Sequence, residues 1–243
     1  MKYVRFRDNS GSAQEGELIR DGIQAGNRLY DPGDVTILPP CRPTKVVCVG
    51  LNYMDHIKET GKEPPNRPKL FLKTPNTIAG HGDTISLPVE KKRIDFEAEL
   101  GVVMGKRCRN ASLDNAMDYV MGFTCLNDIS NRDDQRREQN WVRSKAFDGS
   151  CPVGPYISSV DEVPEGARIT LVQNGIEKQC SSVDRMLFTV PEIIVEITSF
   201  MTLEPGDIIA TGTPSGVGPI SHNDVVEVSI EGIGSLVNYF KKA

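Results

Sequence analysis

Charged and apolar residues alternate, and then give way to an apolar run, in the stretch Ile94-Asp95-Phe96-Glu97-Ala98-Glu99-Leu100-Gly101-Val102-Val103-Met104. A period of two predicts a β-strand, because successive side chains of a strand point to opposite faces. Glu97 and Glu99 then share one face, with Cα atoms about 7 Å apart, while their apolar neighbours pack on the other face. The stretch therefore predicts a β-rich fold that presents two carboxylates side by side.

Two interpretations fit such a carboxylate pair. A solvated polar face is the commoner explanation of an isolated Glu-x-Glu. A hard divalent cation is the alternative, because it offsets the cost of burying carboxylates by taking oxygen ligands at roughly 2.0 to 2.6 Å. Asp128 offers a third carboxylate at the end of the largely apolar run 119–127, and Ser130 or Asn131 can cap the next helix in its place. The three acids together favour the metal site.

The composition indicates an ordinary globular protein that is rich in strands and turns. The chain has 243 residues, of which 38% are hydrophobic and 25% charged, with 22 glycines and 16 prolines. Its net charge of −5 gives no footprint for nucleic acid, and no basic amphipathic helix points to a membrane surface. No apolar stretch approaches the roughly 20 residues of a membrane span, and residues 1–5 lack a hydrophobic signal core. We expect a cytoplasmic protein.

Cysteine and histidine usage argues against a zinc or redox site. The six cysteines include no C-x-x-C pair, so they are expected to be free and mostly buried. Only three histidines are present, which makes a site with several histidine ligands improbable. Any bound metal is therefore expected to have oxygen ligands.

The order of elements predicts a mainly β, α+β fold in two parts. Turn signals at 9–11 and 31–33 indicate a small strand-rich unit at residues 1–43, and the proline-rich segment 38–43 ends it. Residues 44–243 are expected to form a larger domain that carries the candidate catalytic residues described below. Asn174-Gly175 predicts a hairpin, and Thr189 predicts the cap of a helix that follows it.

Three further helices are expected from local patterns. One runs from Asn52, as the N-cap, to about Thr60, and the weakly apolar element with the loop after it could act as a lid. The others cover about 112–118 and, as a solvated helix, 132–138. Lys145 is placed in a loop.

Several side chains could carry chemistry, although a solvated surface role is the commoner one for each alone. His56 and Glu59 lie three residues apart on the lid helix, so the carboxylate can orient the imidazole as a general base. Arg132 and Gln135 have the same spacing and could hold a substrate carboxylate. Lys145 could supply a charge to a developing oxyanion. The turn 212–218 lacks the Gly-Lys-Ser/Thr ending of a P-loop.

From about Lys45 to Asn238 the chain resembles the fumarylacetoacetate hydrolase family. The resemblance rests on separated motifs that occur in this order: Val49-Gly50-Leu51-Asn52-Tyr53 with His56, Lys69-Leu70-Phe71-Leu72-Lys73, Asp95-Phe96-Glu97-Ala98-Glu99-Leu100, Asn127-Asp128, Lys145-Ala146-Phe147-Asp148, Gly212-Thr213-Pro214-Ser215-Gly216-Val217-Gly218 and Glu231-Gly232-Ile233-Gly234. It implies a rolled, mixed β-sheet fold of the type found in the C-terminal domain of that family, with a small N-terminal unit. It also implies a homodimer.

The resemblance also implies the roles of the site residues. Mg²⁺ or Mn²⁺ would be held by Glu97, Glu99 and Asp128, and catalysis would involve His56, Glu59 and Lys145. Substrate would be contacted by Arg132, Gln135 and Thr213. Longer members of the family pair the histidine with a glutamate that aligns with Glu227, so the partner of His56 is either Glu59 or Glu227.

The expected substrate is a small 2-oxo carboxylic acid whose enolate the metal stabilises. We favour hydrolysis of a C–C bond in an acylpyruvate-type compound, with water deprotonated by His56 and Glu59. Decarboxylation of oxaloacetate and isomerisation of 2-hydroxyhepta-2,4-diene-1,7-dioate share the same enolate and stay open. A metal-dependent phosphoryl-transfer enzyme and a non-catalytic binding module are the alternatives from other classes.

Overall fold

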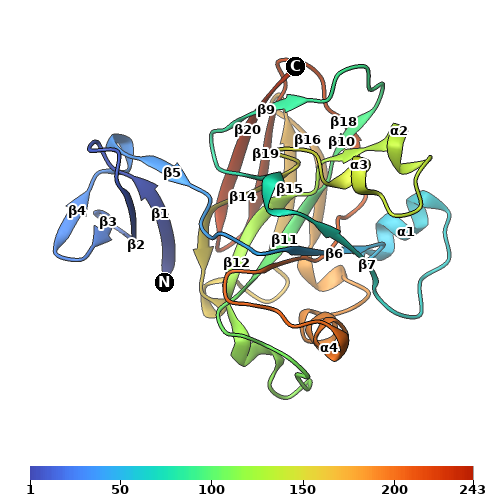
Figure 1. Cartoon of the computed structure of the whole chain (residues 1–243), viewed down its shortest axis with the longest axis horizontal. Coiled ribbons are helices and arrows are strands. Elements are labelled where there is room, and N and C mark those ends of the chain that lie inside the picture. Colours follow the sequence, from blue (N-terminus) through green and yellow to red (C-terminus); the bar gives the residue numbers. More distant parts are fainter. Residues whose placement is uncertain (243) are drawn as a thin grey trace.

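Strands dominate the computed structural model, which describes residues 1–242 and arranges its strands in three sheets (Figure 1). The largest sheet has 12 strands, in the order β4-β3-β2-β1-β14-β12-β11-β17-β6-β7, with β5 beside β1 and β8 beside β14. Its strands are β1 Lys2–Arg7, β2 Ala13–Ile19, β3 Gly22–Ala25, β4 Arg28–Tyr30, β5 Thr36–Leu38, β6 Val46–Gly50, β7 Lys69–Lys73, β8 Ile78–Ala79, β11 Ala98–Met104, β12 Val120–Asn127, β14 Cys151–Ser158 and β17 Ile208–Ala210.

The two smaller sheets have five and three strands. The first follows the order β16-β15-β19-β20-β9 and the second β13-β10-β18. Their strands are β9 Thr84–Leu87, β10 Ile94–Phe96, β13 Ser130–Asn131, β15 Arg168–Gln173, β16 Ile176–Ser182, β18 Gly218–Pro219, β19 Val225–Ile230 and β20 Gly234–Lys242. The α-helices are α1 Met54–Thr60, α2 Arg132–Gln135, α3 Val142–Lys145 and α4 Val190–Phe200.

The main hydrophobic core lies between the large sheet and the five-stranded sheet. Leu100 and Val102 of β11 belong to one buried cluster with Ile169 of β15 and Val228 of β19. In β15 and β19 alternate residues enter this core, whereas β11 is buried on both faces, with Val103 in a second cluster. The mixed, mainly β fold expected from the alternating stretch is confirmed.

The N-terminal segment is rich in strands, as expected. Figure 1 shows β1 to β5 at one end of the molecule and α1, α2 and α3 at the other. This segment has a small buried cluster of its own, formed by Val4, Phe6 and Ile23. β1 also pairs with β14, which makes the sheet continuous with the rest of the chain. The boundary between residues 43 and 44 stays a prediction.

Local signals were reliable where they consisted of turn and cap residues. Asn174 and Gly175 form the turn between β15 and β16, and both have positive φ. Thr189 and Glu192 form a capping box at the start of α4. The cysteines are free, and within the described residues only Cys180 is exposed. No helix of residues 1–242 is long and apolar enough to cross a membrane.

Two of the expected helices are wrong in extent. The segment 112–118 contains only a 3₁₀ turn at Ala116–Tyr119. One helical turn does form before it, with the N–H of Ala116 donating to the carbonyl of Ser112 at 2.9 Å, but so short a segment has too few such bonds to propagate an α-helix. The helix expected at 132–138 ends at Gln135, because a short segment without an apolar face has too little to stabilise further turns.

Candidate active site

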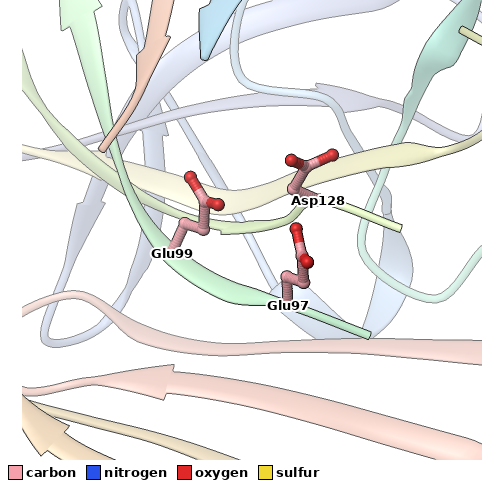
Figure 2. A group of neighbouring side chains, drawn as sticks. All are labelled: Glu97, Glu99 and Asp128. Atoms are coloured by element: carbon pink, nitrogen blue, oxygen red, sulfur yellow. The ribbon is translucent and has the colours of Figure 1, made fainter. Parts of the chain in front are cut away.

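Three carboxylates meet where β11 and β12 run side by side (Figure 2). Glu97 lies between β10 and β11, Glu99 lies in β11, and Asp128 follows β12 directly. The register pairs Ala98 with Asn127, and the N–H of Asp128 donates to the carbonyl of Glu97 at 2.9 Å. One oxygen from each carboxylate lies within 4.8 Å of the others. Strand pairing thus brings together acids that are about 30 residues apart in the sequence.

The three carboxylates are buried, so the solvated-face interpretation does not hold. The exposed fractions are 6% for Glu97, 2% for Glu99 and 0% for Asp128. Buried carboxylates need cations or hydrogen-bond donors to remain charged. Their partners therefore determine what the site can bind.

Lys145 is the central cation of the site, and it ends a short helix where a loop was expected. It ends α3 and is 2% exposed. Its ammonium donates to Glu97 Oε2 at 2.8 Å, to Asp128 Oδ2 at 2.6 Å and to the hydroxyl of Ser130. Although burial alone would lower the pKa of Lys145, the charges of Asp128 and Glu97 raise it well above its usual value. Lys145 is therefore held as a cation between two of the acids.

Arg132 supplies a second positive charge at one side of the triad. Its guanidinium bonds Glu97 and, at 2.9 Å, Asp95, and a further N–H donates to Gln135 Oε1 at 2.8 Å. Burial opposes the charged form of Glu97, but Arg132 and Lys145 hold its pKa far below the usual range. Glu97 is therefore an anion in the folded protein.

Among residues 1–242, Glu99 has no partner comparable to the two cations that bond Glu97. Burial, and then the charges of Asp128 and Glu97, raise its pKa well above the usual value. Its carboxylate accepts the backbone N–H of Gly212 at 2.8 Å. The third carboxylate of the group is thus poorly compensated by the side chains of residues 1–242.

A divalent cation fits this arrangement. Asp128 Oδ1 lies 2.9 Å from the ammonium of Lys73, yet within residues 1–242 it is a buried oxygen without a properly directed hydrogen bond. This oxygen of Asp128 and the carboxylate of Glu99 are therefore available as ligands within the triad. All the donors are carboxylate oxygens, the ligands that Mg²⁺ and Mn²⁺ favour.

Three residues that hold the acids in place stand in the family motifs quoted above, but no role was predicted for them. Lys73 is fully buried and donates to the carbonyl of Ser150 at 2.7 Å. Asn127 accepts the N–H of Glu97 at 2.9 Å. Asp95 shares the alternation of Glu97 and Glu99, a signal that could have identified it. For Lys73 and Asn127 no periodic pattern indicates the role, because their partners lie far away in the sequence.

All nine residues expected at the site line one cavity of about 520 Å³. The cavity lies within the size range of small-molecule sites. It is lined by His56, Glu59, Glu97, Glu99, Asp128, Arg132, Gln135, Lys145 and Thr213. The structure therefore brings the expected residues together.

The lid helix α1 carries the expected dyad. His56 Nδ1 lies 3.0 Å from Glu59 Oε2, and the other oxygen of Glu59 accepts the N–H of Gly216 at 3.1 Å. Glu227 is on β19, where its carboxylate accepts the hydroxyl of Ser229 at 3.2 Å. Of the two candidate partners, Glu59 is the one that contacts His56.

The expected N-cap of the lid helix is wrong. The cap is Tyr53, and Asn52 instead joins two segments that are distant in sequence. Its amide donates to the carbonyls of Thr211 and Phe188, and its oxygen accepts the N–H of Phe188 at 2.8 Å. Asn52 is completely buried. These bonds fix the start of the lid to the turn that carries Thr213.

Asn52→Ala is expected to lower the free energy of unfolding by about 1 to 3 kcal/mol, because it leaves buried backbone groups unpaired. For a chain of this size that amounts to a fall of several degrees in melting temperature, at roughly 2 to 4 °C per kcal/mol. Calorimetry measures the shift. Asn66→Ala, an exposed site in the following loop, is the control and should change little. Equal melting temperatures for the two variants would contradict the role of Asn52 in joining these segments.

Comparison with known proteins identifies relatives over most of the chain. The family model described as the C-terminal domain of fumarylacetoacetate (FAA) hydrolase matches residues 45–241. The mitochondrial oxaloacetate tautomerase Fahd2a of Rattus norvegicus is 39% identical over 246 residues, which cover 97% of this chain and 78% of the relative.

Two solved structures have similar folds. The 2-hydroxyhepta-2,4-diene-1,7-dioate isomerase from Mycobacterium marinum has a TM-score of 0.88 and 36% identity, with 100% of this chain and 98% of that one covered. The fumarylpyruvate hydrolase from Pseudomonas aeruginosa, solved in complex with Mn²⁺ and pyruvate, has a TM-score of 0.78 and 30% identity, with 86% and 92% covered. Together with the family match, these similarities lead to one conclusion: the chain belongs to the fumarylacetoacetate hydrolase family.

Proposed function

We propose that the chain is a divalent-metal-dependent enzyme that moves a proton at the carbon next to the 2-oxo group of a small 2-oxo carboxylic acid. The observation that carries the proposal is the position of two groups on one cavity: the buried carboxylate triad and the His56–Glu59 dyad. Enolisation requires a cation that binds the 2-oxo acid and a base that takes a proton from its carbon, and the two groups would supply the ligands of the cation and the base.

The roles of the triad follow from its oxygen donors and its uncompensated charge. Glu97, Glu99 and Asp128 would hold Mg²⁺ or Mn²⁺, which when bound supplies Lewis-acid polarisation of the substrate's carboxylate and 2-oxo oxygens. Lys145 and Arg132 keep Glu97 ionised and oriented. In this arrangement Lys145 donates to three protein oxygens, so its expected contact with a substrate oxygen stays a prediction.

The dyad provides the proton transfer. With Nδ1–H donated to Glu59, the free Nε2 of His56 takes a proton from the substrate carbon and returns it at a second position. Glu59 stabilises the imidazolium that forms, and the N–H of Gly216 holds Glu59 in place. Gln135 and Thr213 line the same cavity and are proposed to contact the substrate carboxylate.

The relatives support proton transfer as the reaction. A tautomerase at 39% identity and an isomerase at 36% identity are both named for moving a proton within a substrate. Hydrolysis of an acylpyruvate-type C–C bond is the second candidate, because a structure named as a fumarylpyruvate hydrolase binds Mn²⁺ and pyruvate. There the same dyad would deprotonate a water in place of a carbon acid. Oxaloacetate decarboxylation would need no base.

A substrate panel tests the proposal. The purified protein would be incubated with Mg²⁺ or Mn²⁺ and the enol form of oxaloacetate, 2-hydroxyhepta-2,4-diene-1,7-dioate, fumarylpyruvate and a simple acylpyruvate, with EDTA as the control. We expect loss of enol absorbance without release of pyruvate or CO₂ on at least one compound, and abolition of that activity by EDTA. Pyruvate release would select hydrolysis or decarboxylation instead. The absence of metal-dependent turnover on every compound would overturn the proposal.

A further inference from the structure

The charges that line the cavity are not all matched within the protein. Three cations that line the cavity pair with its buried acids. Arg93 bonds Asp95 at 3.0 Å, and Arg132 and Lys145 bond the acids described above. The cavity is also lined by Lys62 and Lys69, and no carboxylate of residues 1–242 lies within 4.0 Å of either ammonium. The cavity therefore presents two cations that are not paired with an acid of residues 1–242.

Lys69 is held in a defined position on the cavity wall. It is the first residue of β7, where it pairs with Gly50 of β6. Its ammonium lies 4.4 Å from the centre of the Trp141 ring, and Trp141 packs edge to face on Phe71 at 5.4 Å. A cation stacked on an anchored indole is restricted in position, although it carries no counter-ion. Burial, and then the charge of Lys62, lower the pKa of Lys69, which an anion placed between the two lysines would reverse.

The two groups of charged residues in the cavity differ in burial. The carboxylate triad and Lys145 are buried, whereas Lys62 and Lys69 are exposed at the opening. A 2-oxo acid whose reacting end reaches the triad therefore directs its far end toward the lysines. A neutral tail would gain nothing from these charges, whereas a second carboxylate would be attracted to them.

We infer that Lys69, stacked on Trp141 and assisted by Lys62, forms a subsite for a carboxylate at the far end of the substrate, so that the chain prefers dicarboxylic 2-oxo acids. This inference rests on the proposed function, because it takes the 2-oxo acid end to lie at the triad. It narrows the proposed substrate class from small 2-oxo carboxylic acids in general to those that carry a second carboxylate.

The test uses two stable ligands of equal chain length, so that binding is measured without turnover. 2-Oxoglutarate ends in a carboxylate and 2-oxopentanoate in a methyl group. Calorimetric titration in the presence of Mg²⁺ is expected to give about tenfold tighter binding of 2-oxoglutarate by the wild-type protein. Lys69→Met should remove that preference and leave the affinity for 2-oxopentanoate unchanged.

Matched variants separate the subsite from a general effect of charge. Lys69→Arg keeps a cation over Trp141 and should retain most of the preference. Lys106→Met removes an exposed lysine outside the cavity and should have no effect. Equal affinity of the wild-type protein for the two ligands, binding of neither, or a preference that survives Lys69→Met would overturn the inference. The two proposals can fail separately. Absence of turnover in the substrate panel would overturn the proposed function, whereas the titrations measure the preference for a second carboxylate without turnover.

Discussion

Glu99→Gln is expected to abolish divalent-metal binding and, with it, metal-dependent turnover. Glutamine has nearly the same shape and can still accept the N–H of Gly212, which bonds Glu99 at 2.8 Å. It removes one of three anionic ligands. Loss of an outer-shell partner costs about 10- to 100-fold in metal affinity, and loss of a ligand itself should cost roughly ten times more than that. Titration with Mn²⁺ and calorimetry with Mg²⁺ measure the loss.

The same substitution should stabilise the protein when metal is absent. Burial beside Asp128 and Glu97 raises the pKa of Glu99 in the folded state above its unfolded value of 4.5. A carboxyl group with a raised folded-state pKa contributes stability at pH values below 4.5, and that contribution is lost as the pH rises through the window between the two pKa values. At neutral pH the metal-free wild type is therefore destabilised by Glu99, and Glu99→Gln should melt higher by a few degrees.

Two measurements make this prediction sharp. In EDTA, the wild-type melting temperature should fall as the pH rises from about 4.5 toward neutrality by more than that of Glu99→Gln. Added Mg²⁺ should raise the melting temperature of the wild type and leave that of the variant unchanged. Glu165→Gln removes an exposed carboxylate and serves as the control. A variant that still binds Mn²⁺ with wild-type affinity would contradict the assignment of Glu99 as a ligand.

His56→Ala is expected to lower kcat by about 100- to 10,000-fold, the usual contribution of a positioned general base. Metal affinity should not change, because the three carboxylates that could hold an ion are those of Glu97, Glu99 and Asp128, and His56 is not among them. Steady-state turnover on the best substrate of the panel, together with Mn²⁺ titration, separates the two effects.

Companion variants decide how the base is assembled. Glu59→Gln keeps a hydrogen-bond partner 3.0 Å from His56 but removes the charge, so its loss of kcat should be smaller than that of His56→Ala. Glu227→Gln should leave kcat unchanged, and His222→Ala, at an exposed histidine, is the control. Loss of metal binding in His56→Ala would instead make His56 a ligand. Full activity in that variant would favour a reaction without a base, such as decarboxylation.

The sequence was sufficient where the signal was local or periodic. Alternation placed Glu97 and Glu99 on one face because strand geometry has a fixed period. The Asn174-Gly175 turn and the Thr189 cap were predictable because their hydrogen bonds and φ angles involve only a few adjacent residues. The joint order of the separated motifs indicated the family, which in turn supplied the expected residues of the site.

Long-range partners decided what the sequence could not. Asn52 is a good N-cap by type, but its buried bonds to Phe188 and Thr211 involve residues more than 130 positions away. Lys145 has the composition of a surface loop residue, yet two acids, 17 and 48 positions away, hold it in the interior. A local sequence pattern does not predict such pairs, because a charge can be buried at low cost only after folding has brought its counter-ion next to it.

For this protein, then, the sequence by itself determined the mainly β fold and the set of acids on one strand face. Only the tertiary structure decided that Asp128 joins them within 4.8 Å, that Glu59 and not Glu227 contacts His56, and that Lys69 has no acid partner among residues 1–242. The physical reason is the range of the forces involved. Backbone geometry and turn chemistry act between neighbouring residues, whereas the electrostatic balance of a buried site depends on every charge that folding brings within a few ångströms.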